Sequence, residues 1–143
     1  KSLAIVIKAG KTGITTELML FQIRNNATFA SKTNKTQVRL DIVSVTANAD
    51  FFFRIILNAT AGGSPSFADF DTNTSLVAID TAGTTRTGGR VLAAFVVDAN
   101  NGQVIDLSQY DIYMVPGDII SVTAQSSGAG AAAQAALSWF EEI

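Results

Sequence analysis

The sequence predicts an all-β protein, an antiparallel two-sheet sandwich with a jelly-roll-like topology. Short segments alternate apolar and polar residues at every second position, which is the side-chain period of a β-strand. Clusters of Asn, Asp, Ser, Gly and Pro separate these segments, as turns between strands do. The strand-like segments do not alternate along the chain with segments of helical periodicity, so a parallel α/β sheet is not expected. About eight to ten short strands of this kind fit a sandwich or a jelly roll.

We expect a single domain over residues 1–143, because a chain of 143 residues can enclose one sizeable core. An alternative interpretation treats residues 1–15 as an N-terminal arm or a linker from a longer chain. The sequence begins with Lys1, so we expect a processed product, a fragment or the ordered part of a longer protein. The stretch 1–7 is too short an apolar segment for a secretory signal, and no small-residue cleavage site follows it.

Ten segments are expected to form strands. One of them, residues 36–46, changes phase: Val38, Leu40 and Ile42 share one face, whereas Val43 and Val45 lie on the other. Such a slip indicates a bulge or a strand that passes between two environments. The ten segments are 3–7, 17–24, 36–46, Phe51–Leu57, 76–79, Arg90–Val97, 103–107, 110–115, 118–125 and 131–143.

The last segment, residues 131–143, is ambiguous. Its Ala, Gln, Leu and Glu content favours a helix. A period of two also fits, with Ala133, Ala135, Leu137 and Trp139 on one side. Tertiary context often overrides propensity, and a chain rich in strands needs partners for their edges. We therefore expect a strand. The residues expected in the core are Phe53, Ile55, Leu57, Val122, Leu137 and Trp139.

The strand Phe51–Leu57 is apolar on both faces, whereas a sandwich buries one face of each strand. The second face carries Phe52 and Ile56 and needs cover. The loop 58–73 could supply it through Phe67 and Phe70. A second copy of the chain is the alternative that we favour, because charged residues make up 15% of the sequence and apolar ones 48%.

Composition argues against an enzyme. The chain has no His and no Cys. It therefore lacks the commonest general base, histidine, and it has no cysteine thiolate that could act as a nucleophile or bind a metal ion. The net charge of −2 does not indicate binding to nucleic acid or to an anionic membrane. The longest uncharged stretch, 119–140, is interrupted by many polar residues, so no membrane span is expected.

Few residue patterns suggest a site, and we assign no catalytic, cofactor-binding or metal-binding residue and no cofactor. Asp69, Asp71 and Asn73 have the alternate spacing of calcium ligands. Their loop lacks the glycine and the helical flanks of an EF-hand, so turn capping is the favoured role. Adjacent Glu141 and Glu142 point apart on a strand, which suits a solvated end rather than a catalytic pair.

Three further patterns have simple explanations. Sequons begin at Asn26, Asn34, Asn58 and Asn73, and a chain rich in Asn and Thr produces such sequons by chance. The glycines at 88–89, 128 and 130 lack the context of a phosphate loop. The phenylalanines at 51–53 and Trp139 could stack on sugars or bases, but at strand spacing such residues usually belong to the core.

Several stretches resemble a β-rich module of tailed-bacteriophage virion proteins, over residues 16–143. They are TELMLFQIRN (16–25), TQVRLDIVSVTA (36–47), FFFRIILNAT (51–60), SFADFDTNTSLVAIDTAGT (66–84), IDLSQYDIYMVPGDIISVTAQSS (105–127) and LSWFEEI (137–143). The Ala-rich stretch 128–136 departs from the expected β-branched pattern. The resemblance implies a capsid-decoration, head-fibre or tail-associated protein that forms a homotrimer, with a final strand around Trp139. It implies no active-site residue.

Two hypotheses of function follow. The first is a bacteriophage virion structural protein on the particle surface, which acts by assembling with its own copies and with capsid, fibre or tail proteins. The second is a carbohydrate-binding, receptor-recognition domain of a phage fibre. A host glycan would then bind exposed aromatic and Asp/Asn clusters near one end of the sandwich.

Overall fold

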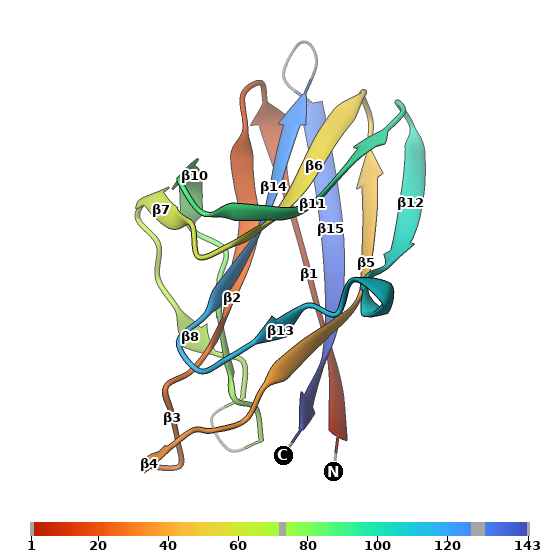
Figure 1. The fold of residues 1–143 in the computed structure, drawn as a ribbon. Helices are drawn as coiled ribbons and strands as arrows, with labels where there is room; N and C mark the ends of the chain where they lie inside the picture. The colour runs from red at the N-terminus through yellow and green to blue at the C-terminus, as the bar shows by residue number, and fades with distance from the viewer. Residues whose placement is uncertain (1, 72–73, 127–130, 143) are drawn as a thin grey trace.

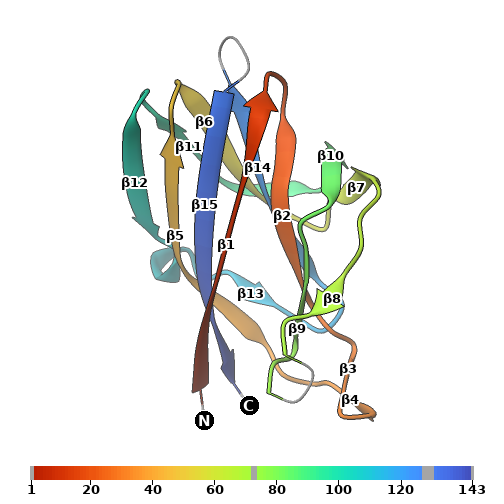
Figure 2. The ribbon, with the colours of Figure 1, turned by 180° about the vertical axis from the view of Figure 1, so that it is seen from behind.

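The computed structural model describes residues 2–71, 74–126 and 131–142, and it confirms an all-β sandwich of two antiparallel sheets (Figures 1 and 2). The first sheet has the order β1 (Ser2–Ile14), β15 (Ala131–Glu142), β5 (Val38–Ala47) and β12 (Asn101–Asp106), and β13 (Tyr113–Met114) pairs with β5. The second has the order β11 (Arg90–Val97), β6 (Phe51–Leu57), β14 (Ile119–Ser126), β2 (Leu18–Asn25), β9 (Val77–Asp80) and β8 (Ala68–Asp69).

Four nested strand pairs define the topology. The first long strand, β1, pairs with the last, β15, and β2 pairs with β14. Further inward along the chain, β5 pairs with β12 and β6 pairs with β11. All four pairs are antiparallel, and they alternate between the two sheets. A long hairpin folded over in this way is a jelly roll of eight strands.

The long connection between β6 and β11, residues 58–89, is elaborated with further strands; we call it the insertion. It contains β7 (Thr60–Gly63) and β10 (Gly83–Thr87), which pair with each other, and also β8 and β9, which extend the second sheet beyond β2. A hairpin of β3 (Thr28–Phe29) and β4 (Lys32–Thr33) lies outside both main sheets. The loop expected over 58–73 therefore contains two short strands in its described part.

The core confirms most of the residues expected there. Phe53, Ile55, Val122, Leu137 and Trp139 are fully buried. Leu57 is half-buried and packs against the edge of the core. The last segment is a strand, as expected, because β1 and β5 pair with it on both edges and thereby satisfy its backbone groups. This pairing outweighs the helical propensity of its alanines.

The phase slip expected in residues 36–46 is a bulge in β5. Leu137 of β15 pairs with Val43, but Trp139 pairs with Leu40, so two residues of β5 lie opposite Ser138 alone. The Ser138 hydroxyl fills the gap, because it accepts a hydrogen bond from the Ile42 amide at 3.1 Å. The bulge turns Ile42 outward, with 39% of its surface exposed.

The ends of several elements differ from expectation. Residues 2–14 form β1 and pair with β15 over most of their length, where an arm or linker was one interpretation of this region. Of the strand expected over 110–115, only Tyr113–Met114 is extended in a ladder. Tyr110 instead ends a 3-10 helix, η1 (Leu107–Tyr110), which Asp106 caps by accepting a bond from the Ser108 amide at 2.9 Å.

The second face of β6 is covered differently from either expectation. Ile56 is fully buried within one chain, and a Cβ built on Gly89 would lie 2.7 Å from its side chain and 2.8 Å from Ala59. The insertion therefore covers Ile56, and no second copy is needed there. Phe67 and Phe70 do not supply this cover: Phe67 stacks under Arg24 and Phe70 packs edge-on against Trp139.

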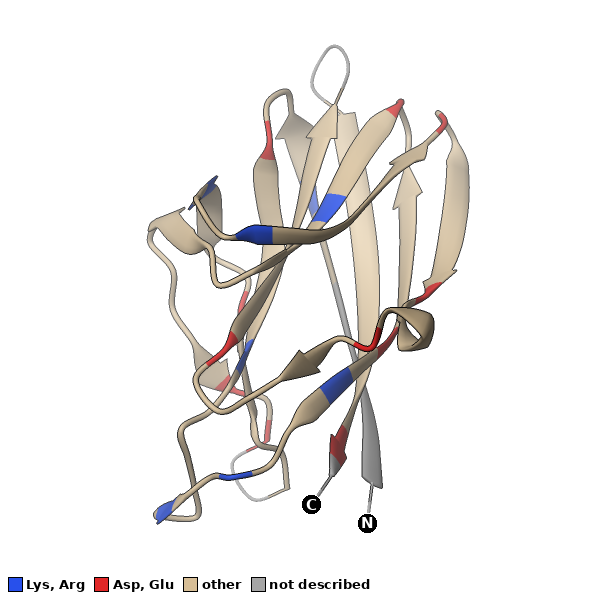
Figure 3. Ribbon diagram, in the orientation of Figure 1, with Lys and Arg blue, Asp and Glu red and all other residues tan. Residues whose placement is uncertain are grey.

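Charged residues are sparse along the strands of both sheets (Figure 3). Among the described residues, every buried side-chain nitrogen or oxygen has a hydrogen-bond partner. No helix in this described part is long and apolar enough to cross a membrane.

Burial of the last strand predicts a clear effect on stability. Leu137→Ala removes a fully buried side chain, and we expect it to lower the free energy of unfolding by about 2–5 kcal/mol. Val104→Ala alters a side chain on β12 that is 69% exposed, and it should change stability by less than about 0.5 kcal/mol. Urea unfolding measures both; a loss below about 1 kcal/mol for Leu137→Ala would contradict this packing.

Candidate functional site

A buried carboxylate joins the last strand to the insertion. Glu141 of β15 has no exposed surface. One of its oxygens accepts hydrogen bonds from the Ser75 hydroxyl at 2.7 Å and from the Trp139 indole at 2.9 Å. The other accepts a bond from the Leu76 amide. The expectation of a solvated end is therefore wrong for Glu141, and the Glu142 side chain lies outside the described residues.

A second buried carboxylate, Asp80, organises the insertion itself. Its Oδ1 accepts bonds from the amides of Ser66 and Ala82, both at 2.9 Å. Its Oδ2 accepts bonds from the Gln22 side chain at 2.8 Å and from the Gly83 amide at 3.1 Å. Burial raises the pKa of Asp80, but these hydrogen bonds outweigh it and hold the pKa below its ordinary value.

Lys11 adds a cationic contact beside Asp80. Its Nζ donates to the carbonyl oxygens of Met19 and Gly83, each at 2.7 Å. Burial lowers the pKa of Lys11, and the negative charge of Asp80 opposes that shift. The ammonium group therefore ties β1 to β2 and to the start of β10.

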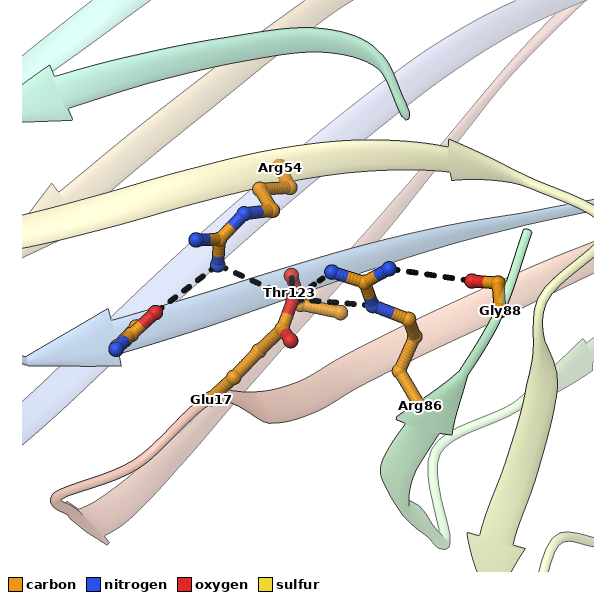
Figure 4. Close-up of polar contacts among 6 residues, drawn as sticks. Glu17, Arg54, Arg86, Gly88 and Thr123 are labelled. Carbon is orange, nitrogen blue, oxygen red and sulfur yellow. Dashed lines mark hydrogen bonds and ion pairs between the residues drawn. The ribbon is translucent and has the colours of Figure 1, made fainter. Parts of the chain in front are cut away.

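A third carboxylate, Glu17, lies between two arginines on the outer face of the second sheet (Figure 4). Its Oε2 accepts bonds from the Thr123 hydroxyl at 2.7 Å and from Arg86, and it forms an ion pair with Arg54 at 3.2 Å. Burial raises the pKa of Glu17, but the bonds from Thr123 and Arg86 and the two positive charges bring it below its usual range. Arg86 belongs to β10, so this network also fastens the insertion.

An open cleft lies at the end of the sandwich that carries the β3–β4 hairpin. Its volume is about 730 Å³, and its lining includes Phe29, Arg24, Asn26 and Asp69. Arg24 donates to the Asn26 side chain at 3.1 Å, and Asn26 donates to Asp69 at 3.1 Å. The Arg24 guanidinium also lies 4.4 Å from the centre of the Phe67 ring. Amide, carboxylate and guanidinium groups beside aromatic rings can bind the hydroxyls and the apolar face of a sugar.

The residues singled out as possible calcium ligands take other positions. Asp69 bonds to Asn26 in the cleft, Asp71 is exposed, and Asn73 lies outside the described residues. No group of three or more acidic side chains that could hold a metal ion occurs in the described ranges.

The sequon asparagines also differ in their surroundings. Asn34 is buried, where it donates to the Asn25 side chain at 2.8 Å. Asn58 is exposed and bonds to Asp118, and Asn26 is half-buried beside Asp69. Asn73 lies outside the described part. The glycines at 128 and 130 do so as well.

Sequence reasoning missed the roles of Glu17, Asp80 and Glu141. Their partners lie 69, 58 and 66 residues away along the chain, at Arg86, Gln22 and Ser75 respectively. No local pattern reports such distant pairs. A weak signal was present, because each acidic residue lies in or beside an apolar strand segment, where a charge needs a partner.

No family model matches the chain, and no curated protein does. A chain in the structure of infectious bursal disease virus, Gx strain, has 10% sequence identity and a TM-score of 0.38, with 100% of this chain and 37% of that one covered. A chain in the crystal structure of the T13 IBDV viral particle has 12% identity and a TM-score of 0.28, with coverage of 99% and 36%. This chain thus spans little more than a third of either. Likeness at such TM-scores says nothing about function.

Removal of the Glu141 charge should loosen the insertion. Glu141→Gln places an amide nitrogen where an oxygen now accepts hydrogen bonds, so at least one buried donor loses its partner. We expect a loss of about 1–3 kcal/mol in the free energy of unfolding. Urea titration followed by the fluorescence of Trp139, the single tryptophan of the chain, measures it. Gln134→Ala, at an exposed position of the same strand, is the control; equal stabilities for the two variants would contradict the proposed role.

Stability should fall with acidification through Asp80. Because the pKa of Asp80 is lowered in the folded state, the unfolded chain binds more protons below about pH 5, and the stabilisation is lost as the pH falls through the folded pKa. Asp80→Asn should be less stable at pH 7 and should lose less stability on acidification. Chemical unfolding between pH 7 and pH 3 tests this, with Gln134→Ala as a control without a titratable change. Equal slopes for wild type and Asp80→Asn would refute it.

Proposed function

We propose that this chain is a virion structural protein of a tailed bacteriophage, a capsid-decoration or head- or tail-fibre module on the particle surface. It acts through protein–protein assembly. The observation that carries the proposal is the exposed apolar surface on one side of a closed jelly roll. The residues with large exposed apolar side chains include Val91 and Val96 of β11, Val104 of β12, and Tyr110, Tyr113 and Val115.

These residues belong to neighbouring elements. β11 and β12 are joined by a short turn and are the end strands of the two sheets on the same side, and η1 and β13 follow β12 in the chain (Figure 1). Val96 and Val104 are 63% and 69% exposed. Several apolar groups on one side of a small protein favour contact with other proteins. The resemblance to phage virion modules supports the same role, by analogy of family rather than by site chemistry.

Two finer proposals accompany this one. The chain has no enzymatic activity, on the ground that the sequence contains neither His nor Cys. It assembles as a homo-oligomer, and the resemblance favours a trimer. Phe52 supports self-association, because it remains half-buried on the outer face of β6 with the Arg54 guanidinium 4.2 Å from its ring centre.

The cleft favours a second candidate function, a glycan-binding module of a phage fibre. It unites Asn26, Asp69 and Arg24 with Phe29 at one end of the sandwich. Phe70, 41% exposed, follows Asp69 directly in the chain. Aromatic and Asp/Asn groups at one end of the fold are the features that this hypothesis requires.

Rebinding to particles separates the two functions. The purified chain, added to virions of a phage that lacks the gene for this chain, should bind at a fixed ratio to the major capsid or fibre protein. Asp69→Ala should bind equally well, because the cleft has no part in assembly. Micromolar binding to a glycan array that Asp69→Ala abolishes and that Asp111→Ala retains, without binding to particles, would overturn the structural role in favour of the glycan module.

A further inference from the structure

We infer that the cleft beside the β3–β4 hairpin binds an acidic sugar, and that the guanidinium of Arg24 holds the carboxylate of that sugar. The inference goes beyond the structural role. It deepens the glycan-binding candidate and rests on it, because it names the chemical class of the glycan and the residue that selects it.

Arg24 presents a free pair of donors in the cleft. Its Nε donates to the Asn26 side chain at 3.1 Å, and the centre of the Phe67 ring lies 4.4 Å from its guanidinium carbon. No described residue accepts a hydrogen bond from Nη1 or Nη2, and Arg24 forms no ion pair with a described carboxylate. The residue is half-buried and lines the cleft. The guanidinium is thus held in place while its two terminal nitrogens remain available to a ligand.

Asn26 joins Arg24 to an acceptor, Asp69. Its Oδ1 accepts the bond from Arg24, and its Nδ2 donates to Asp69 Oδ1 at 3.1 Å. The main chain of Asn26 is fixed as well, because its amide donates to the Leu76 carbonyl at 2.9 Å and its carbonyl accepts a bond from Asn34 at 2.8 Å. Oδ2 of Asp69 accepts no bond from a described residue. A donor pair and an acceptor are therefore in place before a ligand arrives, which lowers the cost of binding.

The charges of the cleft fit a single carboxylate better than a polyanion. The described lining contains one cation, Arg24, and one anion, Asp69. The planar fork of a guanidinium matches a carboxylate through two parallel hydrogen bonds. Asp69 accepts bonds and donates none, so it requires donors such as sugar hydroxyls. It would also repel a chain with many sulfate or phosphate groups, which one lining cation does not offset. A molecule with one carboxylate and several hydroxyls meets these conditions.

The β3–β4 hairpin supplies an apolar wall. Phe29 is half-buried and lines the cleft, and an aromatic ring can pack against the C–H face of a sugar. Lys32 pairs directly with Phe29 in the hairpin. Opposed residues share a face, so a second positive charge lies near the rim. The cleft volume of about 730 Å³ is in the usual range for small-molecule sites.

The tip of the same hairpin is strained where it borders the cleft. Ala30 and Ser31 both line the cleft, and both have positive φ angles, of 52° and 64°. Asparagine and glycine are the usual residues at such turn positions, because a Cβ disfavours the left-handed conformation. Strained backbone of this kind clusters at binding sites, which fits a ligand at this end of the sandwich.

Matched glycan pairs test the chemical class. The probes are sialylated and uronate-containing oligosaccharides, each compared with the same oligosaccharide after reduction of its carboxylate to an alcohol. We expect at least one acidic glycan to bind with a Kd below about 1 mM. Reduction should weaken binding at least about tenfold, because hydrogen bonds between charged groups are lost. Equal binding within every pair, or no acidic glycan bound at that concentration, would overturn the inference.

Variants at Arg24 test the residue. Arg24→Gln should remove the preference for the acidic member of each pair, and Arg24→Lys, which keeps the charge without the fork, should retain only part of it. Arg39→Gln is the matched control, since Arg39 also stacks on an aromatic ring, that of Phe140, but belongs to the other sheet. It should bind as the wild type does.

Circular dichroism and urea unfolding establish that each variant is folded. An unchanged preference in folded Arg24→Gln or Arg24→Lys would overturn the assignment of the carboxylate to Arg24. An equal loss of preference in Arg39→Gln would overturn it too. Asp69→Ala should weaken binding of both members of a pair alike, because the hydroxyls that it binds are common to both.

The outcomes separate this inference from the proposed functions. Glycans bound through Asp69 with no preference for a carboxylate would support the glycan candidate and refute this inference. Binding of sulfated or phosphorylated glycans in place of carboxylated ones would also refute it. A chain that binds no glycan but binds particles at a fixed ratio refutes the inference and leaves the virion role intact. A chain that binds acidic glycans through Arg24 supports the inference, whether or not it binds particles.

Discussion

The structure depends on the pairing of β15 with β1 on one edge and with β5 on the other. β15 is the last strand along the chain and pairs with the first, β1. The β1–β15 pair is therefore the outermost of the four nested pairs of the jelly roll. β15 also supplies Leu137 and Trp139 to the core. An Ala-rich segment alone would favour a helix, and it becomes a strand here because two neighbours satisfy its backbone groups along its length.

Buried and half-buried carboxylates then decide where the insertion lies. Glu141 holds it at Ser75 and Leu76, Asp80 shapes its turn, and Glu17 holds Arg86. All three contacts join it to the sandwich through β15, β2 and the β1–β2 turn, on the side away from β12. The insertion covers Ile56 but leaves the outer edge of β11 open. The chain thus covers one side of the sandwich itself, whereas no strand of the described residues pairs with the outer edge of β11.

The period-two pattern of apolar residues was sufficient to predict most of the strands. Phe51–Leu57 and Arg90–Val97 have the bounds expected from sequence, and the bulge in β5 follows from the phase slip at Ile42. The pattern failed where contacts are distant. Glu141 was expected in solvent because no residue near it in the sequence indicates that Ser75 is its hydrogen-bond partner. The sequence predicted only that aromatic and Asp/Asn residues would gather near one end of the sandwich, and it did not identify the residues of the cleft. Those residues come from segments as far apart along the chain as Arg24 and Gly117.

A buried core, fixed polar contacts and exposed apolar side chains on β11, β12 and β13 are the features on which the proposed role in assembly rests. The fold alone does not assign this role, because jelly rolls serve as capsid and as lectin domains. A reconstruction of intact particles by electron cryomicroscopy tests the central claim most directly. We expect density for this sandwich at regular positions on the particle, with neighbouring proteins against β11 and β12. Particles without this density, or with the sandwich attached by the β3–β4 end and its β11 side bare, would contradict it.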